Sequence, residues 1–396
     1  ILHHAGRLHE SLVEFDAGQR LLDHHGEVAE QIRFHNNRGV VLLQQGQFSR
    51  ADADFRAAER LAAEAELWSA QAQSVANRAV LLGRSRRLVE AIGEFERAAE
   101  HFERAGSPAR LVATMSIDQA EVMMHSGLTA DAVAAGHAAI ASIRETGNSV
   151  LLGDAQLVTA RAEMAAGRLR AANVTASSAT QTFAASDRSD MVPHARSVEV
   201  TVALLAARNE TDVAEQLSEA AIVIDSLRAA GWDDPADALA VERIRAARRW
   251  RLTEVVSEDV ERLRAGASAG RRDTALVGWW AEAVAHESAG HHEAAAEACH
   301  AGLDILDDIV AEAPSLEKRS AAMTIGGDLS QLLIELAVAD LDAETALAAA
   351  EGTRARSLHD ELADSRPHRT LTRRGAVRLR NDLVDRLGDR SLVEWV

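Results

Sequence analysis

The chain of 396 residues has few aromatic side chains and few prolines. Aromatic residues make up 3% of it, Tyr is absent and Pro occurs 5 times. Strands favour β-branched and aromatic residues, and a turn-rich protein needs more turn residues than this, so the composition argues against an all-β fold. Ala, Leu, Glu and Arg, which favour helices, dominate instead. The composition therefore predicts an all-α protein.

Cysteine, positive charge and long apolar runs are also scarce. The single cysteine, Cys299, cannot form an internal disulfide, which favours a reducing compartment. Lys and Arg number 43 against 61 Asp and Glu, so the formal net charge is −18, which repels phosphate backbones and disfavours nucleic acid as a partner. No apolar run approaches the length of a membrane span, and the first residues do not resemble a signal peptide. We therefore expect a cytoplasmic protein with no membrane partner.

A pattern recurs along the chain with a period of about 40–42 residues. In its clearest copy a glycine is followed, five, nine and twelve positions later, by small or aromatic residues. We interpret each copy as two antiparallel helices in which the glycine ends the first helix and the small residue lies where the helices cross. Such hairpins cannot bury their apolar faces alone and must stack. The copies include Gly46, Ala51, Phe55 and Ala58, then Ala91, Phe95 and Ala98, then Gly167, Ala172, Ala176 and Ala179.

Two of these copies resemble the tetratricopeptide repeat (TPR) family nearly position for position. The resemblance is carried by Asn37, Gly39, Gly46, Phe48, Ala51, Phe55 and Ala58, and by Asn77, Ala79, Leu88, Ala91, Phe95 and Ala98. The unit here is about six residues longer than the TPR unit, which adds roughly one turn to each helix. The resemblance implies an α-α superhelix of about eight to nine TPR-like helical hairpins over residues 1–360, with the first repeat truncated.

The resemblance also implies a concave face, lined by the first helix of each hairpin, that binds a protein or peptide. Asparagines on this face, such as Asn37 and Asn77, would bond a peptide backbone; the alternative is that they only bond between helices. Thr114 and Asp118 replace the basic pair with which some TPR proteins grip a C-terminal carboxylate, which disfavours that mode. Counting from the turn glycines predicts these groove residues: Arg33, Asn36, Asn37, Gln44, Asn77, Arg84, Asp118, Glu121, His125 and Arg161.

The last 45 or so residues depart from the repeat. Glu351, Arg354-Ala355-Arg356, Leu358 and Leu392-Val393-Glu394-Trp395 resemble the junction of bacterial TPR proteins that carry a C-terminal CHAT domain, a caspase-like cysteine peptidase. The resemblance implies a basic linker at 361–390 and the first strand of that domain at 391–396, with the catalytic residues beyond residue 396. The linker would dock on the acidic solenoid or on a neighbouring domain through its arginines, which include Arg366, Arg369, Arg373 and Arg374.

The residues that could form catalytic or metal-binding motifs do not have the spacing that such motifs require. His286-Glu287 and His292-Glu293 do not begin a His-Glu-x-x-His motif. Cys299 and His300 are adjacent on a predicted helix, where neighbouring side chains diverge, so they cannot form a nucleophile–base pair. No phosphate-binding glycine-rich loop is present. We therefore expect no metal site, no cofactor and no catalytic residue in this chain.

The predicted function is a non-catalytic protein–protein interaction scaffold, the regulatory or sensor arm of a CHAT-type peptidase whose catalytic domain would be a partner in cis. The alternative is the TPR sensor segment of a bacterial signalling or transcription-regulatory protein that binds a peptide or small ligand. A caspase-like His and Cys after residue 396 would favour the first, and a DNA-binding helix-turn-helix the second.

Overall fold

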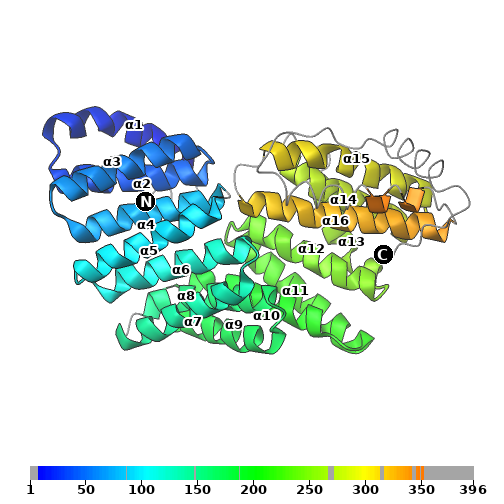
Figure 1. Cartoon of the computed structure of the whole chain (residues 1–396). Coiled ribbons are helices and arrows are strands. Elements are labelled where there is room, and N and C mark those ends of the chain that lie inside the picture. Colours follow the sequence, from blue (N-terminus) through cyan, green and yellow to red (C-terminus); the bar gives the residue numbers. More distant parts are fainter. Residues whose placement is uncertain are drawn as a thin grey trace, which may run out of the picture. The chain divides into compact units, whose positions relative to one another are not determined.

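The structure is a computed structural model that describes residues 8–85, 87–146, 149–186, 188–265, 272–312, 316–340, 345–347 and 349–351. Every regular element in these ranges is a helix, so the predicted all-α fold is confirmed (Figure 1). Two short 3-10 helices, η1 (Ser189–Met191) and η2 (Thr253–Val256), accompany the α-helices. The α-helices are α1 (Leu8–His25), α2 (Val28–Gln44), α3 (Phe48–Glu64), α4 (Trp68–Arg84), α5 (Leu88–Arg104), α6 (Ala109–His125), α7 (Thr129–Thr146), α8 (Ser149–Ala165), α9 (Leu169–Ala184), α10 (Val192–Ala206), α11 (Glu210–Ala229), α12 (Asp233–Arg249), α13 (Ser257–Arg264), α14 (Arg272–Ser288), α15 (His292–Glu312) and α16 (Leu316–Ala339).

The chain divides into two compact units. Unit 1 comprises Ile1–Leu252 and Pro314–Glu317, and unit 2 comprises Thr253–Ala313 and Lys318–Val396. The linker predicted at 361–390 and the strand predicted at 391–396 lie outside the described residues.

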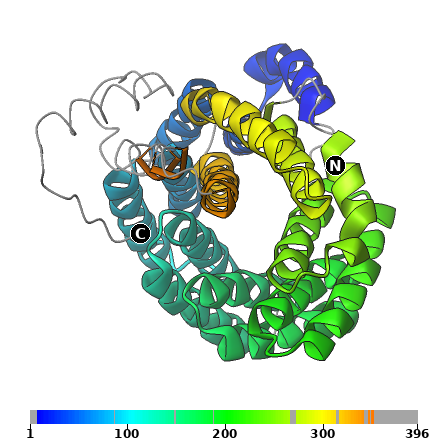
Figure 2. The same ribbon diagram turned by 90° about the vertical axis from the view of Figure 1, so that its right-hand side faces the viewer.

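Unit 1 is a stack of the helix hairpins α2–α3, α4–α5, α6–α7, α8–α9 and α10–α11, followed by α12. Helices α2, α4, α6 and α8 begin 40 or 41 residues apart, which matches the sequence period. Each even-numbered helix from α2 to α10 also packs against the next even-numbered helix, whereas the backbones of the described odd-numbered helices of unit 1 lie farther apart, although Arg97 on α5 forms an ion pair with Glu59 on α3. The even-numbered helices therefore form the closely packed inner layer of the stack, and the hairpins follow a curved path from blue through cyan to green (Figure 2).

Glycines end several of the inner-layer helices, as the repeat predicts. Gly46 has a φ of 73°, in the left-handed region that disfavours a side chain. Its N–H donates to the carbonyl of Leu43 at 3.0 Å, and the N–H of Gln47 donates to the carbonyl of Leu42 at 2.8 Å. Gly127 and Gly167, with φ of 80° and 71°, close α6 and α8 with the same pair of hydrogen bonds. These bonds satisfy carbonyl groups that the helix end would otherwise leave unpaired.

The small residues of the repeat lie where the helices cross. Ala51 and Ala91 have no exposed surface, and Phe55 and Phe95 are buried beside them. The predicted packing role of these positions is therefore confirmed, because a larger side chain at either alanine would displace its neighbours.

An arginine of the inner layer also bonds the outer helix of the same hairpin. Arg38 on α2 donates to both carboxylate oxygens of Asp54 on α3, at 2.7 and 2.6 Å. Burial alone would raise the pKa of Asp54, but the hydrogen bonds from Arg38 and His35 outweigh it and lower that pKa. Arg78 repeats the arrangement with Glu94, again 16 residues later, at 2.8 Å. Each of these two pairs ties the helices of its hairpin together.

Unit 2 contains the hairpin α14–α15 and the long helix α16. Glycines permit close approach here, since a Cβ on Gly326 would lie 2.3 Å from Leu306 and one on Gly302 would lie 2.7 Å from Leu329. Cys299 on α15 is buried in this unit, as expected of a small packing residue. The expectation that no apolar run approaches the length of a membrane span is not met by α16. Its segment Ala322–Ala339 is long and apolar enough to cross a membrane by length and composition, and half of it is buried inside the protein.

Candidate partner-binding site

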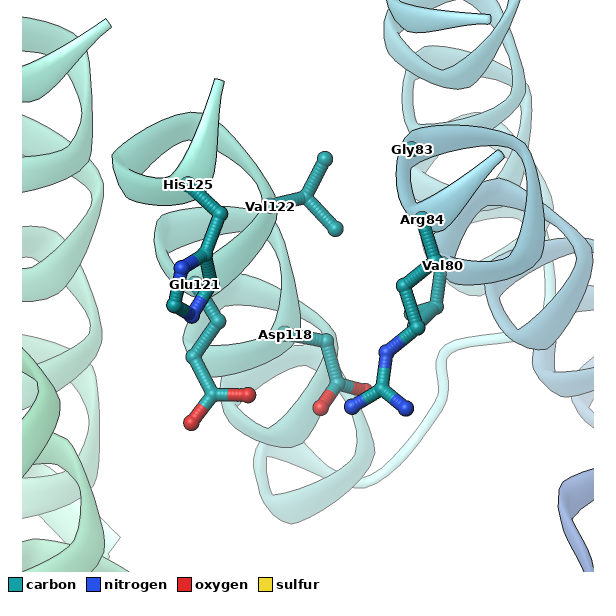
Figure 3. A pocket seen from close by; sticks show the side chains of 7 residues that line it. All are labelled: Val80, Gly83, Arg84, Asp118, Glu121, Val122 and His125. Carbon is teal, nitrogen blue, oxygen red and sulfur yellow. The ribbon is translucent and has the colours of Figure 1, made fainter. Parts of the chain in front are cut away.

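A hollow lies between α4 and α6 on the inner layer of unit 1 (Figure 3). It is small, with a volume of about 10 Å³ that has room for about one water molecule. Four of the ten residues that the sequence predicts on the concave face meet at this one place. The lining residues are Val80, Gly83, Arg84, Asp118, Glu121, Val122 and His125.

The floor of the hollow is apolar because the two helices approach each other closely. A Cβ on Gly83 of α4 would lie 2.3 Å from a methyl carbon of Val122 on α6, so only glycine allows this spacing. Val80 lies one turn before Gly83 and extends the apolar floor. The charged side chains are carried around this floor by Arg84 on α4 and by successive turns of α6.

The electrostatics of the hollow centre on Asp118, which is only partly exposed. Burial, followed by the negative charge of Glu121, raises the pKa of Asp118 to about 7, while Arg84 acts in the opposite direction. Figure 3 shows the guanidinium group of Arg84 pointing toward the carboxylate of Asp118.

The inner layer continues the charged groups onto α8 and α10. Burial lowers the pKa of Arg161 on α8, and the negative charge of Glu121 opposes that shift. Burial, followed by Arg161, lowers the pKa of His194 on α10 to about 4, against the opposing charge of Asp190. Charged groups of α4, α6, α8 and α10 therefore influence one another along unit 1.

His194 was not predicted from the sequence as a site residue. Its ring is buried edge-on against Trp232, with ring centroids 4.6 Å apart, and its Nε2 atom has no hydrogen-bond partner among the residues that the structure describes. A lone histidine at a helix start carries no sequence signal for this position. Only the packing of α10 beside α8 brings it near Arg161.

Two of the three asparagines of the predicted groove, Asn36 and Asn77, bond between helices. Asn36 is buried on α2, and its amide donates to the hydroxyl of Ser74 on α4 at 3.0 Å. Asn77 of α4 donates to Asn36 at 3.2 Å and accepts from Gln73 at 3.1 Å. For Asn77 this geometry fits the alternative that the asparagines only bond between helices. Asn36 is buried and is therefore not accessible to a partner on the concave face. The remaining α2 residues of the predicted groove are exposed and do not line the hollow: Arg33, Asn37 and Gln44.

The other predicted sites give no further chemistry. In the part of the chain that the structure describes, no three His, Cys, Asp or Glu side chains are grouped to hold a metal ion. The junction arginines lie outside the described residues: Arg366, Arg369, Arg373 and Arg374.

Comparison with models of known protein families gives no match, and comparison with curated proteins gives none either. The fold itself is an all-helical array of repeated helix hairpins, which is compatible with a TPR-like solenoid.

Proposed function

We propose that this chain is a non-catalytic scaffold that binds a protein or peptide partner on the inner layer of unit 1. The observation that carries the proposal is the convergence of Arg84, Asp118, Glu121 and His125 around one hollow. Recognition sites are concave, have an apolar floor and hold a few convergent polar groups, often with shifted pKa values. The hollow between α4 and α6 has each of these properties.

A peptide-display selection against the whole chain tests this proposal. Selected peptides should lose at least tenfold in affinity when Arg84→Ala and Glu121→Ala are introduced together. The matched control is Arg56→Ala with Glu100→Ala, which removes one base and one acid exposed on the outer helices α3 and α5. An equal loss of peptide affinity in both double variants, or a selection that yields no binding peptide, would argue against the inner layer as the binding face.

The partner in cis is a second part of the proposal. The likeness of Glu351, Arg354, Leu358 and the segment 392–395 to a TPR–CHAT junction supports a regulatory arm attached to a caspase-like peptidase. The acidic net charge and the basic linker supply an electrostatic contact between arm and catalytic domain.

The full-length parent protein tests this second part. Arg373→Glu with Arg374→Glu should change basal peptidase activity, whereas Arg84→Ala with Glu121→Ala should change only the response to a bound peptide. An absence of peptidase activity from the full-length protein would exclude this context.

The alternative is a sensor segment of a signalling or transcription-regulatory protein. A small molecule that raises the melting temperature of the chain, and fails to do so in the Arg84→Ala, Glu121→Ala variant, would favour this function.

A further inference from the structure

Apolar side chains are exposed where α2 and α4 begin, at one edge of unit 1. Val28 on α2 is 43% exposed, and Leu67 and Trp68 at the start of α4 are 39% and 36% exposed. The two helix starts lie side by side, because Ile32 of α2 and Ala70 of α4 pack in the same apolar cluster. We call Val28, Leu67 and Trp68 the edge patch.

The surroundings of the edge patch are acidic. Four exposed glutamates border it and form no ion pair with any residue that the structure describes: Glu27, Glu30, Glu64 and Glu66. Arg104 of α5 lies over the Trp68 ring, 5.1 Å from its centroid, and Arg33 and Arg60 lie one helical turn from the glutamates. The glutamates still outnumber these bases, so the edge favours a partner that is both apolar and basic.

Glu66 has a backbone conformation that costs stability. Its φ is 54°, in the left-handed region, and the matching turn of the next hairpin has Gly106 with a φ of 56°. Both turns are closed by the same pair of backbone hydrogen bonds. Glycine adopts this conformation without steric cost, whereas glutamate does not. Strain of this kind is concentrated at positions where the side chain serves a function.

Gln71, one turn after Leu67 on α4, carries a polar atom without a partner. The residue is 9% exposed, and its Oε1 atom has no hydrogen bond to any residue that the structure describes. The matching Gln31 of α2 donates to the carbonyl of Gly26 at 3.0 Å. A backbone group of a bound peptide would supply the missing hydrogen bond to the Gln71 amide.

We propose that the edge patch binds a segment of a partner protein in which apolar side chains are flanked by lysine or arginine. The apolar side chains cover the edge patch, the bases pair with the bordering glutamates, and a backbone group bonds Gln71. This inference goes beyond the proposed function, because Trp68 begins α4 whereas Arg84 of the hollow ends it, about 24 Å away along the helix.

Three twelve-residue peptides test this chemistry on the whole chain. The first is KLLKKLLKKLLK, the second has glutamate in place of lysine, and the third has serine in place of leucine. Binding is followed by the indole N–H NMR signal of Trp68, with that of Trp232 as the internal reference. The lysine–leucine peptide should shift the Trp68 signal with at least tenfold higher affinity than the other two, and should leave the Trp232 signal in place.

Two glycine substitutions separate a binding role from a structural one. Glu66→Gly should raise the melting temperature, because it relieves the strained backbone, and should weaken the lysine–leucine peptide at least threefold. The matched control is Arg251→Gly after α12, where φ is 59° and the residue is exposed. This control should raise the melting temperature without changing the affinity.

A second pair of variants tests the charges. Glu27→Gln with Glu64→Gln should weaken the lysine–leucine peptide at least fivefold. Glu96→Gln with Glu215→Gln, which removes two exposed acids of α5 and α11, should leave the affinity unchanged.

Several outcomes would overturn the edge patch as a binding site. They are an unshifted Trp68 signal, equal or tighter binding of the glutamate or serine peptide, and equal losses of affinity in a variant and its matched control. No substitution in this experiment touches Arg84 or Glu121, so its result is independent of the peptide-display test of the inner layer.

Discussion

Gly39 on α2 lies directly against the ring of Phe55 on α3, such that a Cβ at residue 39 would be 2.5 Å from Phe55 Cε1. Gly153 on α8 and Phe183 on α9 repeat the contact with the same distance. Both phenylalanines are fully buried. The two hairpins thus share one packing arrangement, in which a glycine of the inner layer leaves room for an aromatic ring from the outer layer.

The first prediction concerns this contact. Gly39→Ala should destabilise the chain by about 1–3 kcal/mol, because overpacking against a buried ring outweighs the gain of about 1 kcal/mol in helix propensity. The matched control is Gly93→Ala on α5, where an added Cβ meets nothing within 4 Å and should stabilise by up to about 1 kcal/mol. Chemical denaturation measures the free energy of unfolding of both variants and of the parent. Stabilisation by both substitutions would show that the Phe55 ring moves aside freely.

The second prediction concerns the crossing points of the hairpins. Ala51→Glu and Ala91→Glu should each destabilise by roughly 2–4 kcal/mol, since each adds bulk and an unpaired charge to a site without exposed surface. Ala53→Glu and Ala99→Glu, exposed on the same helices, serve as controls. Thermal melts that agree within about a degree between buried and exposed variants would contradict the packing.

The third prediction concerns Asp118. Its pKa of about 7 in the folded chain is above the ordinary value of 3.8, so the folded state binds this proton more tightly than the unfolded state. Its contribution to stability is therefore full at low pH and is lost as pH rises from about 4 to about 7. Asp118→Asn removes this loss and should be more stable than the parent at pH 8, by on the order of 1–3 kcal/mol. Chemical denaturation at several pH values measures the difference in free energy of unfolding between the variant and the parent. This difference should become smaller from pH 8 to pH 5, and a difference that does not depend on pH would contradict the raised pKa of Asp118.

The fourth prediction concerns His194, whose effect has the opposite sign. Its pKa of about 4 is below the ordinary 6.5, so the unfolded state binds the proton more tightly and stability is lost as pH falls from about 6.5 to about 4. His194→Phe keeps a ring against Trp232, so the change in its free energy of unfolding from pH 7 to pH 5 should be more favourable than that of the parent by on the order of 1–2 kcal/mol. Unfolding titrations at the two pH values measure this change in both proteins, and an equal change in the two would rule out His194 as a source of pH dependence.

Asp118 and His194 titrate in overlapping ranges with opposite effects. Between about pH 4 and pH 6.5 a fall in pH stabilises the fold through Asp118 and destabilises it through His194. Their contributions offset each other in the parent chain. Each single variant should therefore depend on pH more steeply than the parent, in opposite directions.

Much of the fold follows from local sequence signals. The turn glycine Gly46 and the crossing residue Ala51 act within one hairpin, so their spacing alone predicts their roles. The division after Leu252 was not predicted, because it depends on which helices pack together and not on the period.

The candidate site was predicted only in part, for the same reason. Counting along the helices placed Arg84 and Asp118 on one face, but only the contact between α4 and α6 makes them neighbours. The same counting placed Asn36 on that face, and it could not foresee that Ser74 would bury it. His194 depends on a still longer-range contact, with the environment of Arg161.

The contact between Gly83 and Val122 has a mechanical consequence. In unit 1 neighbouring hairpins contact each other mainly through their even-numbered helices, and an ion pair between Arg97 on α5 and Glu59 on α3 also joins the outer layer. Because a Cβ at residue 83 would lie 2.3 Å from Val122, any larger side chain there would have to separate α4 from α6 and would change the angle between their two hairpins.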